Sequence, residues 1–451
     1  MTAEILSISR AIAAAGGRAI LVGGSVRDRL LGIASKDYDL EVHGLPIARL
    51  EDVLRGFGEV IAVGRAFGVL RVKGLDAEFS MPRRDSKTGR GHRGFLVEFD
   101  PSMDFAEAAR RRDLTINAMG LDPLTGELLD PHGGQQDLER RVLRAVDRRT
   151  FGEDSLRGLR AAQFAARLEM EPDGELVEIC SALDLSDLPG ERILEEFRKL
   201  LLKGRRPSAG LAFLERTDLL RFFPELKAMV GVPQDPEWHP EGTVWEHTLL
   251  VVDEAARLRA GNEAEDLALL FGALLHDVGK PSTTVEEEGR IRSPSHEDAG
   301  APIAAAFLGR LRAPLDLTAK VAALTRYHLA PANFQKQGAT ERAFRRLARK
   351  LGEAGVSMEA LERVARADHF GRTTPDALAR EFPQGEEFLQ RARELAVQTS
   401  APKDVVLGRH LIARGLPPGP GFGPILDRCR DVQDETGLTD PEAILDRVLG
   451  N

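Results

Sequence analysis

The stretch that decides the fold of the first part of this chain is Leu21-Val22-Gly23-Gly24-Ser25-Val26-Arg27-Asp28. It joins an apolar run over Arg18–Val22, typical of a short buried strand, to a helical pattern that begins at Val26. Glycines at such a junction leave backbone N–H groups unshielded, and the N-terminal end of a helix carries partial positive charge. The sequence therefore predicts a turn that binds phosphate oxygens.

A pair of carboxylates, Asp37 and Asp39, follows at the start of the next predicted strand. Side chains at positions i and i+2 of a strand point to one face of the sheet, so the two carboxylates are placed to share a metal ion. Mg²⁺ prefers carboxylates combined with substrate phosphates, and paired metal ions activate a hydroxyl while they stabilise a leaving pyrophosphate. Glu78, on a later strand, is a candidate third catalytic carboxylate. Gly-Gly turns and Asp-x-Asp pairs are each common, so neither motif alone predicts a catalytic site. The prediction rests on their combination.

The spacing of apolar residues predicts an α+β chain, in which a small mixed sheet with helices packed on it is followed by helices. Strands are predicted over Arg18–Val22, Tyr38–Val42, Glu59–Val63, Val69–Lys73 and Ala77–Met81, and helices over Ala3–Ala14, from Val26, and over Ile47–Gly56. A basic, glycine-rich loop is predicted over Pro82–Gly94. From about Ala106 onward strand signals nearly vanish, and helices are predicted over Leu156–Leu168, Ile193–Leu202 and Ser208–Arg216. The proline-rich stretch Pro233–Pro240 marks a domain boundary.

Composition argues against several classes of protein. With 451 residues, 42% hydrophobic and 29% charged, the chain has material for about three domains and is not disordered as a whole. No apolar run approaches the ~18 residues of a membrane span, and Met1–Gly17 lacks the pattern of a secretory signal. Two cysteines, Cys180 and Cys429, make no disulfide framework, which fits a reducing compartment. We therefore expect a cytoplasmic protein without a membrane partner.

Charge is divided unevenly along the chain. The net charge is −9, yet residues 1–160 carry 25 Lys and Arg against 24 Asp and Glu, while the remainder carries 37 against 47. A polyanion is therefore expected to bind the first part of the chain, where arginines concentrate at 83–93, 110–112 and 140–149. Aromatic residues make up only 5%, a poor supply for base-stacking platforms.

A second group of polar residues lies in the helical part of the chain: His247, His276, Asp277, His296, His328 and Asp368. Imidazoles and carboxylates suit divalent transition metals, and also Mg²⁺ or Mn²⁺ where carboxylates and water dominate. An isolated buried histidine is more often a core residue than a ligand. The adjacent pair His276 and Asp277, together with the other histidines, favours a metal site.

With these motifs the chain resembles the bacterial tRNA nucleotidyltransferase (CCA-adding enzyme) and poly(A) polymerase family, class II. Beyond Leu21–Asp28, the resemblance extends over residues 18–225 through motifs in the order of that family. These motifs are Lys36-Asp37-Tyr38-Asp39-Leu40, Gly64-Arg65-Ala66-Phe67, Arg111-Arg112-Asp113-Leu114-Thr115-Ile116-Asn117-Ala118 and Phe151-Gly152-Glu153-Asp154-Ser155-Leu156-Arg157-Gly158-Leu159-Arg160. Ser25 stands where many members have alanine. The resemblance implies a polymerase-β-like nucleotidyltransferase head.

The resemblance also implies catalytic and nucleotide-binding roles. Mg²⁺ would be held by Asp37 and Asp39. The nucleotide would be bound by Gly23, Gly24, Ser25 and Arg27 at the triphosphate, by Arg112 and Asp113 at the sugar and phosphates, and by Asp154, Arg157 and Arg160 at the base. The loop Pro82–Gly94 is similar to the flexible loop that this family associates with the switch to adding A. Its full length argues against an enzyme restricted to C.

Base reading by Asp154 and Arg157 has a physical rationale. Cytosine and adenine each present an amino donor beside a ring-nitrogen acceptor, and a carboxylate and a guanidinium one helical turn apart offer the complementary groups. Uracil and guanine present a carbonyl and an N–H there, and each polar group left unpaired costs roughly 1–3 kcal/mol. The alternative interpretation is an ordinary ion pair between residues i and i+3 of a helix.

The order His247, His276-Asp277 and Asp368 resembles the HD phosphohydrolase superfamily. The surrounding sequence resembles the subtype of the same family that carries a C-terminal HD domain, through Trp238-His239-Pro240, Leu274-Leu275-His276-Asp277-Val278-Gly279-Lys280 and Ala367-Asp368-His369-Phe370-Gly371-Arg372. The resemblance implies a divalent metal ion (Ni, Mn, Mg, Co or Fe) at these residues, with His296 and His328 as extra ligands of a second ion. It implies hydrolysis of phosphomonoesters or phosphodiesters, and a purely structural HD domain is the alternative.

The predicted domains are a catalytic head over 1–145, a helical neck and body over 146–230, an HD domain over 231–380 and a helical tail over 381–451. We expect an enzyme that adds or repairs the 3′-terminal CCA of tRNA from CTP and ATP without a template, as a monomer or homodimer that does not bind DNA. The alternatives are an enzyme limited to CC or to A, a poly(A) polymerase, an HD phosphohydrolase whose first half only binds RNA, and a non-enzymatic tRNA-binding protein.

Overall fold

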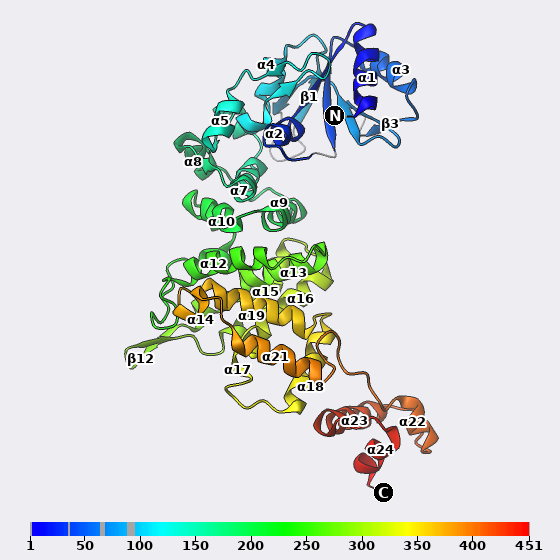
Figure 1. Cartoon of the computed structure of the whole chain (residues 1–451), viewed down its shortest axis with the longest axis vertical. Coiled ribbons are helices and arrows are strands. Elements are labelled where there is room, and N and C mark those ends of the chain that lie inside the picture. Colours follow the sequence, from blue (N-terminus) through cyan, green and yellow to red (C-terminus); the bar gives the residue numbers. More distant parts are fainter. Residues whose placement is uncertain (1, 35–36, 64–67, 88–94, 451) are drawn as a thin grey trace. The chain divides into compact units, whose positions relative to one another are not determined.

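The chain divides by its internal contacts into two compact units, Met1–Phe222 and Phe223–Asn451. The structure is a computed structural model, and it describes residues 2–450 apart from 35–36, 64–67 and 88–94 (Figure 1). The motif Gly64–Phe67, residue Lys36 and residues 88–94 of the predicted basic loop therefore lie outside the described residues. The division between the units falls before the proline-rich stretch, and the division into four domains stays a prediction.

A mixed sheet with the strand order β3-β4-β5-β2-β1-β8-β9 forms the centre of the first unit. β1 (Arg18–Val22) lies inside this sheet, since each of its residues after Arg18 is apolar and buried. It pairs antiparallel with β2 (Tyr38–His43), and β2 pairs parallel with β5 (Ala77–Ser80). The outer strands are β3 (Val60–Val63), β4 (Val69–Val72), β8 (Gly120–Leu121) and β9 (Leu128–Leu129). The strand that begins at the Asp37–Asp39 motif is thus held between two others.

Amphipathic helices cover this sheet. α1 (Ala3–Ala14) begins at the N-cap Thr2 and buries Ile5, Ile8 and Ile12, which recur at helical spacing. α3 (Ile47–Arg55) buries Leu50 and Leu54 in the same way. The short helix α2 (Gly24–Leu30) follows the Gly-Gly turn directly.

Two predictions for the first unit were wrong in detail. Arg83–Lys87, predicted as part of a loop, is β6 and pairs antiparallel with β7 (Phe95–Phe99) in a separate hairpin. Its charged sequence has little intrinsic strand preference, and pairing with the apolar β7 provides its backbone hydrogen bonds. Strands also continue beyond Ala106, because β8 and β9 complete the sheet. They are too short to show the alternation on which the prediction relied.

The rest of the first unit is mostly helical. Its elements are α4 (Phe105–Arg110), α5 (Gly134–Arg140), β10 (Val142–Leu143), α6 (Arg148–Phe151), α7 (Leu156–Leu168), β11 (Glu171–Pro172), α8 (Gly174–Ser181), α9 (Gly190–Lys203) and α10 (Pro207–Arg216). α7 packs against α9 and α10 and is buried over most of its length. The predicted base-reading residues Arg157 and Arg160 lie on this helix, and Asp154 lies just before it.

The second unit is a helical bundle. Its elements are α11 (Pro224–Lys227), α12 (Val244–Arg257), α13 (Glu263–Leu275), α14 (Lys280–Thr283), the hairpin β12 (Val285–Glu287) and β13 (Arg290–Arg292), α15 (His296–Arg310), α16 (Leu315–Tyr327), α17 (Ala330–Asn333), α18 (Glu341–Glu353), α19 (Met358–Gly371), α20 (Pro375–Leu378) and α21 (Pro383–Glu394). A capping box of Thr243 and Glu246 begins α12. α13 is central, since its residues Leu267–Leu275 are all buried. The α+β class is confirmed, and no described helix has the length and apolarity of a membrane span.

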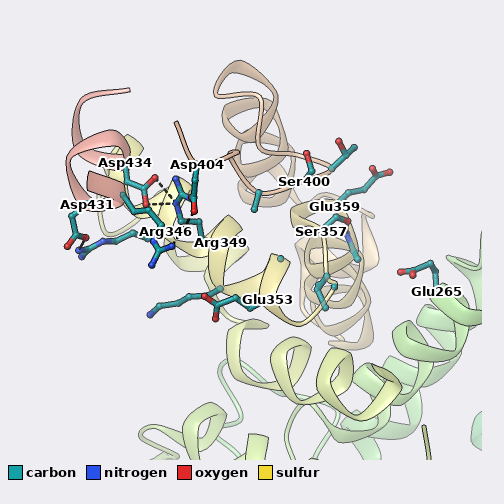
Figure 2. Close-up of a pocket in the computed structure, with 18 of the residues that line it drawn as sticks. Glu265, Arg346, Arg349, Glu353, Ser357, Glu359, Ser400, Asp404, Asp431 and Asp434 are labelled. Atoms are coloured by element: carbon teal, nitrogen blue, oxygen red, sulfur yellow. Dashed lines mark hydrogen bonds and ion pairs between the residues drawn. The ribbon is translucent and has the colours of Figure 1, made fainter. Parts of the chain in front are cut away.

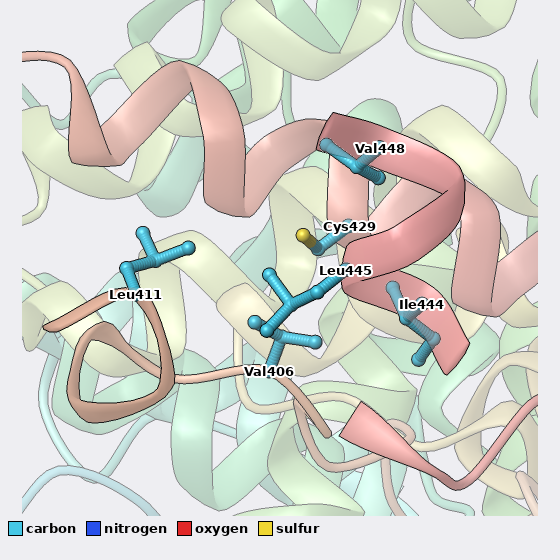
Figure 3. Close-up of a cluster of buried hydrophobic side chains, with 6 residues drawn as sticks. All are labelled: Val406, Leu411, Cys429, Ile444, Leu445 and Val448. Carbon is cyan, nitrogen blue, oxygen red and sulfur yellow. The ribbon is translucent and has the colours of Figure 1, made fainter. Parts of the chain in front are cut away.

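A separate small core holds the C-terminal tail together (Figure 3). From here on, the tail means residues 406–451. It contains three helices, α22 (Gly408–Ala413), α23 (Phe422–Thr436) and α24 (Pro441–Leu449). Its buried side chains are Val406, Leu411, Cys429, Ile444, Leu445 and Val448. All members of this cluster come from the tail, so the tail does not share this core with the bundle.

Ion pairs between α18 and α23 attach the tail to the bundle, beside a cavity of about 1200 Å³ (Figure 2). Nε of Arg349 lies 3.0 Å from both carboxylate oxygens of Asp434, and Nη1 lies 2.5 Å from Oδ1 of Asp404. The side chain of Asp434 is 2% exposed. Arg346 pairs with Asp431 at the more exposed edge of the same contact. A row of arginines on one helix thus meets a row of acids on the other.

Replacement of Arg349 by alanine is expected to loosen this attachment, because it leaves the buried Asp434 without its charge partner. Removing one partner of a buried pair typically costs about 3–5 kcal/mol. Hydrogen exchange of the backbone amides of α23 measures the loss. The control is Arg342→Ala, whose ion pairs at 3.7 and 3.9 Å lie near the surface and contribute about 0–1 kcal/mol. Equal exchange rates in the two variants would contradict the assignment.

Candidate functional site

The turn between β1 and α2 requires glycine at position 23. Gly23 has φ 72° and ψ −138°, a backbone conformation that residues with a Cβ rarely adopt. A Cβ at this position would lie 3.2 Å from Nη1 of Arg112 and 3.9 Å from Oδ2 of Asp39. The hydroxyl of Ser25 donates a hydrogen bond to the carbonyl oxygen of Val22 (3.0 Å) and so stabilises the turn. Glycine therefore lets the backbone approach two of the predicted site residues.

The predicted metal carboxylates lie at the start of β2. Asp37 immediately precedes the strand and Asp39 is its second residue, so the two share a face of the sheet. Loss of hydration raises the pKa of Asp39, with the nearby charge of Asp37 acting in the same direction and that of Arg112 opposing it. Carboxylates crowded in this way fit a bound cation, because a cation relieves their repulsion.

Glu78 lies beside Asp39 on the neighbouring strand, as its register partner in β5. Its carboxylate makes an ion pair with Arg71. Within the described residues, Asp37, Asp39 and Glu78 do not form a group of three converging ligand atoms. The role of Glu78 as a third catalytic carboxylate stays a prediction.

A buried carboxylate that the sequence analysis missed, Glu41, holds the neighbouring arginines in place. Its Oε2 lies 3.0 Å from Nη2 of Arg111 and 3.7 Å from Nη2 of Arg112, and its Oε1 lies 3.2 Å from Nε2 of His43. Burial alone would raise the pKa of Glu41, but His43 and the two arginines lower it to about 2. The sequence signal for Glu41 is its position two residues after Asp39, on the same face of the strand.

Asp113 connects the head to α7. Its Oδ2 accepts a hydrogen bond from Nε of Arg160 (2.7 Å), and its Oδ1 accepts one from Nδ2 of Asn117 (3.0 Å). Oδ1 of Asn117 in turn accepts a hydrogen bond from Nη1 of Arg27 (2.5 Å), and the Arg27 guanidinium lies 5.0 Å from the ring centre of Phe164. The network thus brings together Arg27, Asp113 and Arg160. Asn117 and Phe164 are additional residues that the sequence analysis did not assign.

The predicted base-reading residues lie at the N-terminal end of α7. Oδ1 of Asp154 accepts a hydrogen bond from the backbone N–H of Leu156 (3.1 Å). The guanidinium of Arg157 donates hydrogen bonds to the carbonyl oxygens of Thr150 (2.7 Å) and Arg111 (2.6 Å). In the part of the chain that the structure describes, no ion pair joins Asp154 to Arg157. The structure therefore does not contain the helical ion pair between Asp154 and Arg157 that was the alternative interpretation.

Most of these residues line one cavity of about 730 Å³. The predicted residues in its lining are Gly23, Gly24, Arg27, Asp39, Arg112, Asp113, Asp154, Arg157 and Arg160. Lys199 and Lys203 of α9 also line it, so basic residues of three helices, α2, α7 and α9, line the cavity. Ser25, Asp37 and Glu78 are not in its lining. A cavity in which basic residues outnumber carboxylates suits a polyphosphate with its cation.

The second cluster lies among α12, α13, α15, α16 and α19 of the unit Phe223–Asn451. Its members are His247, His276, Asp277, His296, His328 and Asp368, all of them buried. Two groups of three converging ligand atoms occur among these six residues, one from His247, His276 and Asp277 and one from Asp277, His296 and His328; His247 also belongs to a third group, with His239 and Glu241. Oδ2 of Asp277 lies 3.1 Å from Nε2 of His276, and its Oδ1 lies 3.1 Å from Nε2 of His296. Asp277 therefore connects two candidate metal positions.

Most imidazoles of this cluster are oriented by backbone carbonyl groups. Nδ1 is hydrogen-bonded to a carbonyl oxygen in His276 (Ala273, 2.7 Å), His296 (Ser293, 2.8 Å) and His328 (Thr325, 2.7 Å). Such a bond requires the proton on Nδ1 and leaves a lone pair on Nε2, which is the usual arrangement of metal-ligating histidines. Nε2 of His296 and Nε2 of His328 lie 3.4 Å apart. Two lone pairs that face each other at this distance fit a cation between them.

The carboxylates of this cluster are ionised. The pKa values of Asp277 and Asp368 are held well below their usual range despite burial, Asp277 by His276 and Lys280, and Asp368 by Arg372 and His247. Burial and two neighbouring histidines lower the pKa of His328 to about 3, so this ring is neutral. Nε2 of His276 and Oδ2 of Asp277 are buried without a well-directed hydrogen bond. Burial lowers the pKa of His276 and of His296, but Asp277 raises it above the ordinary value. Imidazoles arranged around ionised carboxylates fit a divalent metal ion.

Glu241, which was not predicted as a site residue, lies in the turn before α12. Its Oε1 is 2.7 Å from Nδ1 of His247 and 2.9 Å from Nδ1 of His239. Lys280 was not assigned a role either, and its Nζ lies 2.6 Å from Oδ2 of Asp277. The sequence signal for Lys280 is its place in the motif that contains His276 and Asp277, and no spacing pattern identifies Glu241.

Three family models match consecutive parts of the chain. They are the poly A polymerase head domain over residues 19–144, the "Probable RNA and SrmB- binding site of polymerase A" over 179–230 and the HD domain over 244–373. With the carboxylate-bearing cavity and the histidine cluster, they define the class of the protein. It is a nucleotidyltransferase that also carries an HD domain.

Curated relatives identify the family within this class. A multifunctional CCA protein of Stenotrophomonas maltophilia (strain K279a) is 38% identical over 426 residues, which cover 91% of this chain and 97% of that protein. A multifunctional CCA protein of Aromatoleum aromaticum is 40% identical over 318 residues, which cover 69% of this chain and 74% of that protein. The chain belongs to the family of multifunctional CCA proteins.

Solved structures show the same fold. The Bacillus stearothermophilus CCA-adding enzyme in complex with CTP matches with a TM-score of 0.67 and 24% identity, covering 100% of this chain and 98% of that one. The Thermotoga maritima CCA-adding enzyme complexed with tRNA matches with a TM-score of 0.60 and 19% identity, covering 100% and 96%. At these identities the likeness concerns the fold alone.

Replacement of Gly23 by alanine is expected to weaken nucleotide binding strongly, because the new Cβ enters the space beside Arg112 and Asp39. The strained backbone should also cost about 1–3 kcal/mol of the free energy of unfolding. Denaturant unfolding and equilibrium binding of CTP measure the two effects.

The control for Gly23→Ala is Gly16→Ala. Gly16 also has a positive φ of 92°, and a Cβ there would meet nothing within 4 Å. This variant should lose stability and keep CTP binding. Unchanged CTP affinity in Gly23→Ala would show that the turn does not contribute to the binding site.

Proposed function

We propose that this chain is a tRNA nucleotidyltransferase that adds or repairs the 3′-terminal CCA of tRNA from CTP and ATP without a nucleic-acid template. The observation that carries the proposal is the cavity lined by Gly23, Asp39 and Asp154 together with basic residues of three helices. A nucleoside triphosphate needs a cation site, a basic wall and a polar edge for its base, and the cavity offers all of these. The names of the family and of the structural neighbours support the same activity.

The reaction joins the 3′-hydroxyl of the primer to the α-phosphate of the nucleotide and expels pyrophosphate. Asp37 and Asp39 would hold Mg²⁺, which when bound neutralises phosphate charge and activates the hydroxyl. Arg27 would bind the triphosphate from a position fixed by Asn117 and by the ring of Phe164. A guanidinium immobilised in this way loses little further entropy when it binds a phosphate.

Asp154 and Arg157 would read the base. Arg157 is held by the carbonyl oxygens of Thr150 and Arg111, and an arginine has five N–H donors, so donors remain for the ring nitrogen of cytosine or adenine. The Asp154 carboxylate would accept from the exocyclic amino group. Because the guanidinium is fixed before the nucleotide binds, a base with the opposite hydrogen-bonding pattern cannot be accommodated by rotation of the side chain.

Replacement of both Asp37 and Asp39 by alanine is expected to abolish nucleotide addition, since the cation loses its protein ligands. The assay contains full-length protein, Mg²⁺, tRNA that lacks its 3′ end and labelled CTP or ATP. Arg71→Ala is the control, because Arg71 pairs with Glu78 on the same sheet and is outside the cavity lining. Persistent extension by the double variant would refute the proposed function.

Products of the same assay separate the related activities. Transcripts that end before the first C, after CC and after CCA should each be completed to CCA and no further. Addition that stops after CC, or that begins only on CC, identifies a partial enzyme. A long A tail identifies a poly(A) polymerase. Pyrophosphate release during extension excludes a protein that only binds tRNA.

A second activity, hydrolysis of phosphomonoesters or phosphodiesters, is favoured by the cluster around Asp277. Its two candidate positions contain two histidines each and share a carboxylate. The nitrogen-rich ligand set favours Ni, Co, Mn or Fe over Mg. A metal ion bound there supplies a Lewis acid and an activated water. Lys280 and Arg372 would keep Asp277 and Asp368 ionised and in place.

His276→Ala is expected to lower metal-dependent hydrolysis by more than the 10–100-fold that loss of a supporting residue costs, and to leave CCA addition unchanged. Release of phosphate from p-nitrophenyl phosphate and opening of 2′,3′-cyclic AMP, each with added Ni²⁺, Mn²⁺, Co²⁺ or Mg²⁺, measure the activity. Hydrolysis without nucleotide addition in the wild-type protein would identify the chain as an HD phosphohydrolase. No hydrolysis with any of the metals would identify a structural HD domain.

The partners of this function are tRNA, CTP and ATP, with no role for DNA or a membrane. We propose action in the cytoplasm, as a monomer or homodimer. The arginines of α2 and α7 at the cavity support the binding of these anionic partners, because Arg27, Arg157 and Arg160 line it. RNA held in this way is recognised through its phosphates and shape, which agrees with the low content of aromatic residues.

A further inference from the structure

The turn before α12 brings a buried negative charge against the ring of His247. Oε1 of Glu241 lies 2.7 Å from Nδ1 of His247 and 2.9 Å from Nδ1 of His239. The side chain of Glu241 is 2% exposed, and that of His247 is not exposed at all. The carboxylate is therefore enclosed by the two rings and has little contact with solvent.

The second oxygen of this carboxylate connects to another helix of the cluster. Oε2 of Glu241 accepts a hydrogen bond from the backbone N–H of Thr373 (3.1 Å). Thr373 follows Arg372, whose Nη2 lies 3.4 Å from both carboxylate oxygens of Asp368. Glu241 thus links the turn that precedes α12 to the end of α19. These two helices carry His247 and Asp368.

His247 differs from the other histidines of the cluster in what faces its Nδ1. The partner of Nδ1 is a neutral backbone carbonyl oxygen in His276, His296 and His328. In His247 it is a carboxylate. A carboxylate that accepts the Nδ1 proton fixes the tautomer and raises the basicity of Nε2, which is the nitrogen that faces Asp368 at 3.1 Å. The 2.7 Å contact between Oε1 of Glu241 and Nδ1 of His247 is close but not well directed for a hydrogen bond.

We propose that Glu241 is a positioning residue that fixes the tautomer and orientation of His247 for metal binding. It acts on the candidate position formed by His247, His276 and Asp277, and not on the position formed by Asp277, His296 and His328. The inference rests on the proposed metal-dependent function of the HD domain.

Binding of Co²⁺ to the full-length protein tests the proposal. Co²⁺ prefers imidazole ligands and therefore reports on the HD domain more than on the carboxylates of the head. Equilibrium dialysis followed by elemental analysis gives affinity and stoichiometry without an activity assay. In Glu241→Gln one carboxylate oxygen becomes an NH₂ group that only donates, and the remaining carbonyl oxygen accepts without a negative charge. We expect the Co²⁺ affinity of one position to fall about 10–100-fold while the other is retained.

Matched variants separate positioning from other effects. Glu237→Gln removes a charge from the same turn at a side chain that is 60% exposed, and it should bind Co²⁺ as the wild type does. His239→Phe keeps an aromatic ring against His247 and should also retain affinity. Glu241→Asp keeps the charge on a shorter side chain and should show an intermediate loss. Circular dichroism and thermal unfolding verify that each variant folds.

The outcomes are distinguishable. Wild-type affinity in both Glu241→Gln and Glu241→Asp overturns the inference and leaves the proposed function intact. An equal loss in Glu237→Gln also overturns it, because net charge then explains the effect. Failure of the wild-type protein to bind Co²⁺ or any other divalent metal at the cluster overturns the proposed metal-dependent activity, and the inference falls with it.

Discussion

The ion pairs of Glu41 are the interaction on which the nucleotide cavity depends. This carboxylate lies inside the sheet on the strand of Asp39, and it binds the guanidinium of Arg111. The carbonyl oxygen of Arg111 holds Arg157, and the chain reaches Asp113 two residues later. One buried charge therefore fixes the strand of Asp39 relative to the residues that we propose to bind the phosphates and the base. A buried carboxylate without its arginine partner is costly in free energy. The contacts of Glu41, Arg111 and Arg157 are therefore expected to form together.

Regular elements with strong periodicity were predictable from the sequence. β1 matches the predicted strand over Arg18–Val22, and α7 matches the predicted helix over Leu156–Leu168, because in both the apolar spacing records burial directly. β8 and β9 were not predictable, since strands of two residues have no period. β6 was not either, since its sequence is charged and its pairing with β7 is a property of the folded hairpin.

Candidate site residues were predictable to the extent that they lie in compact motifs. Gly23, Asp39 and Asp154 line one cavity although they are far apart in the chain, and their motifs had marked all of them. Glu41 and Glu241 were not predicted, for a common reason. Each also contacts residues distant in the chain or on another element, Glu41 through Arg111 and Glu241 through Thr373, and such contacts leave no local pattern in a sequence.

The attachment of the tail has a consequence for how the protein responds to its surroundings. At physiological ionic strength the screening length is about 8 Å, and it shortens as salt is added. The outer pairs of the α18–α23 contact, such as Arg346 with Asp431, are open to this screening. The inner pair of Arg349 and Asp434 is shielded from it. Added salt should therefore weaken the outer ion pairs before the inner one. The tail should then move more about the pair of Arg349 and Asp434 while it stays attached to the bundle.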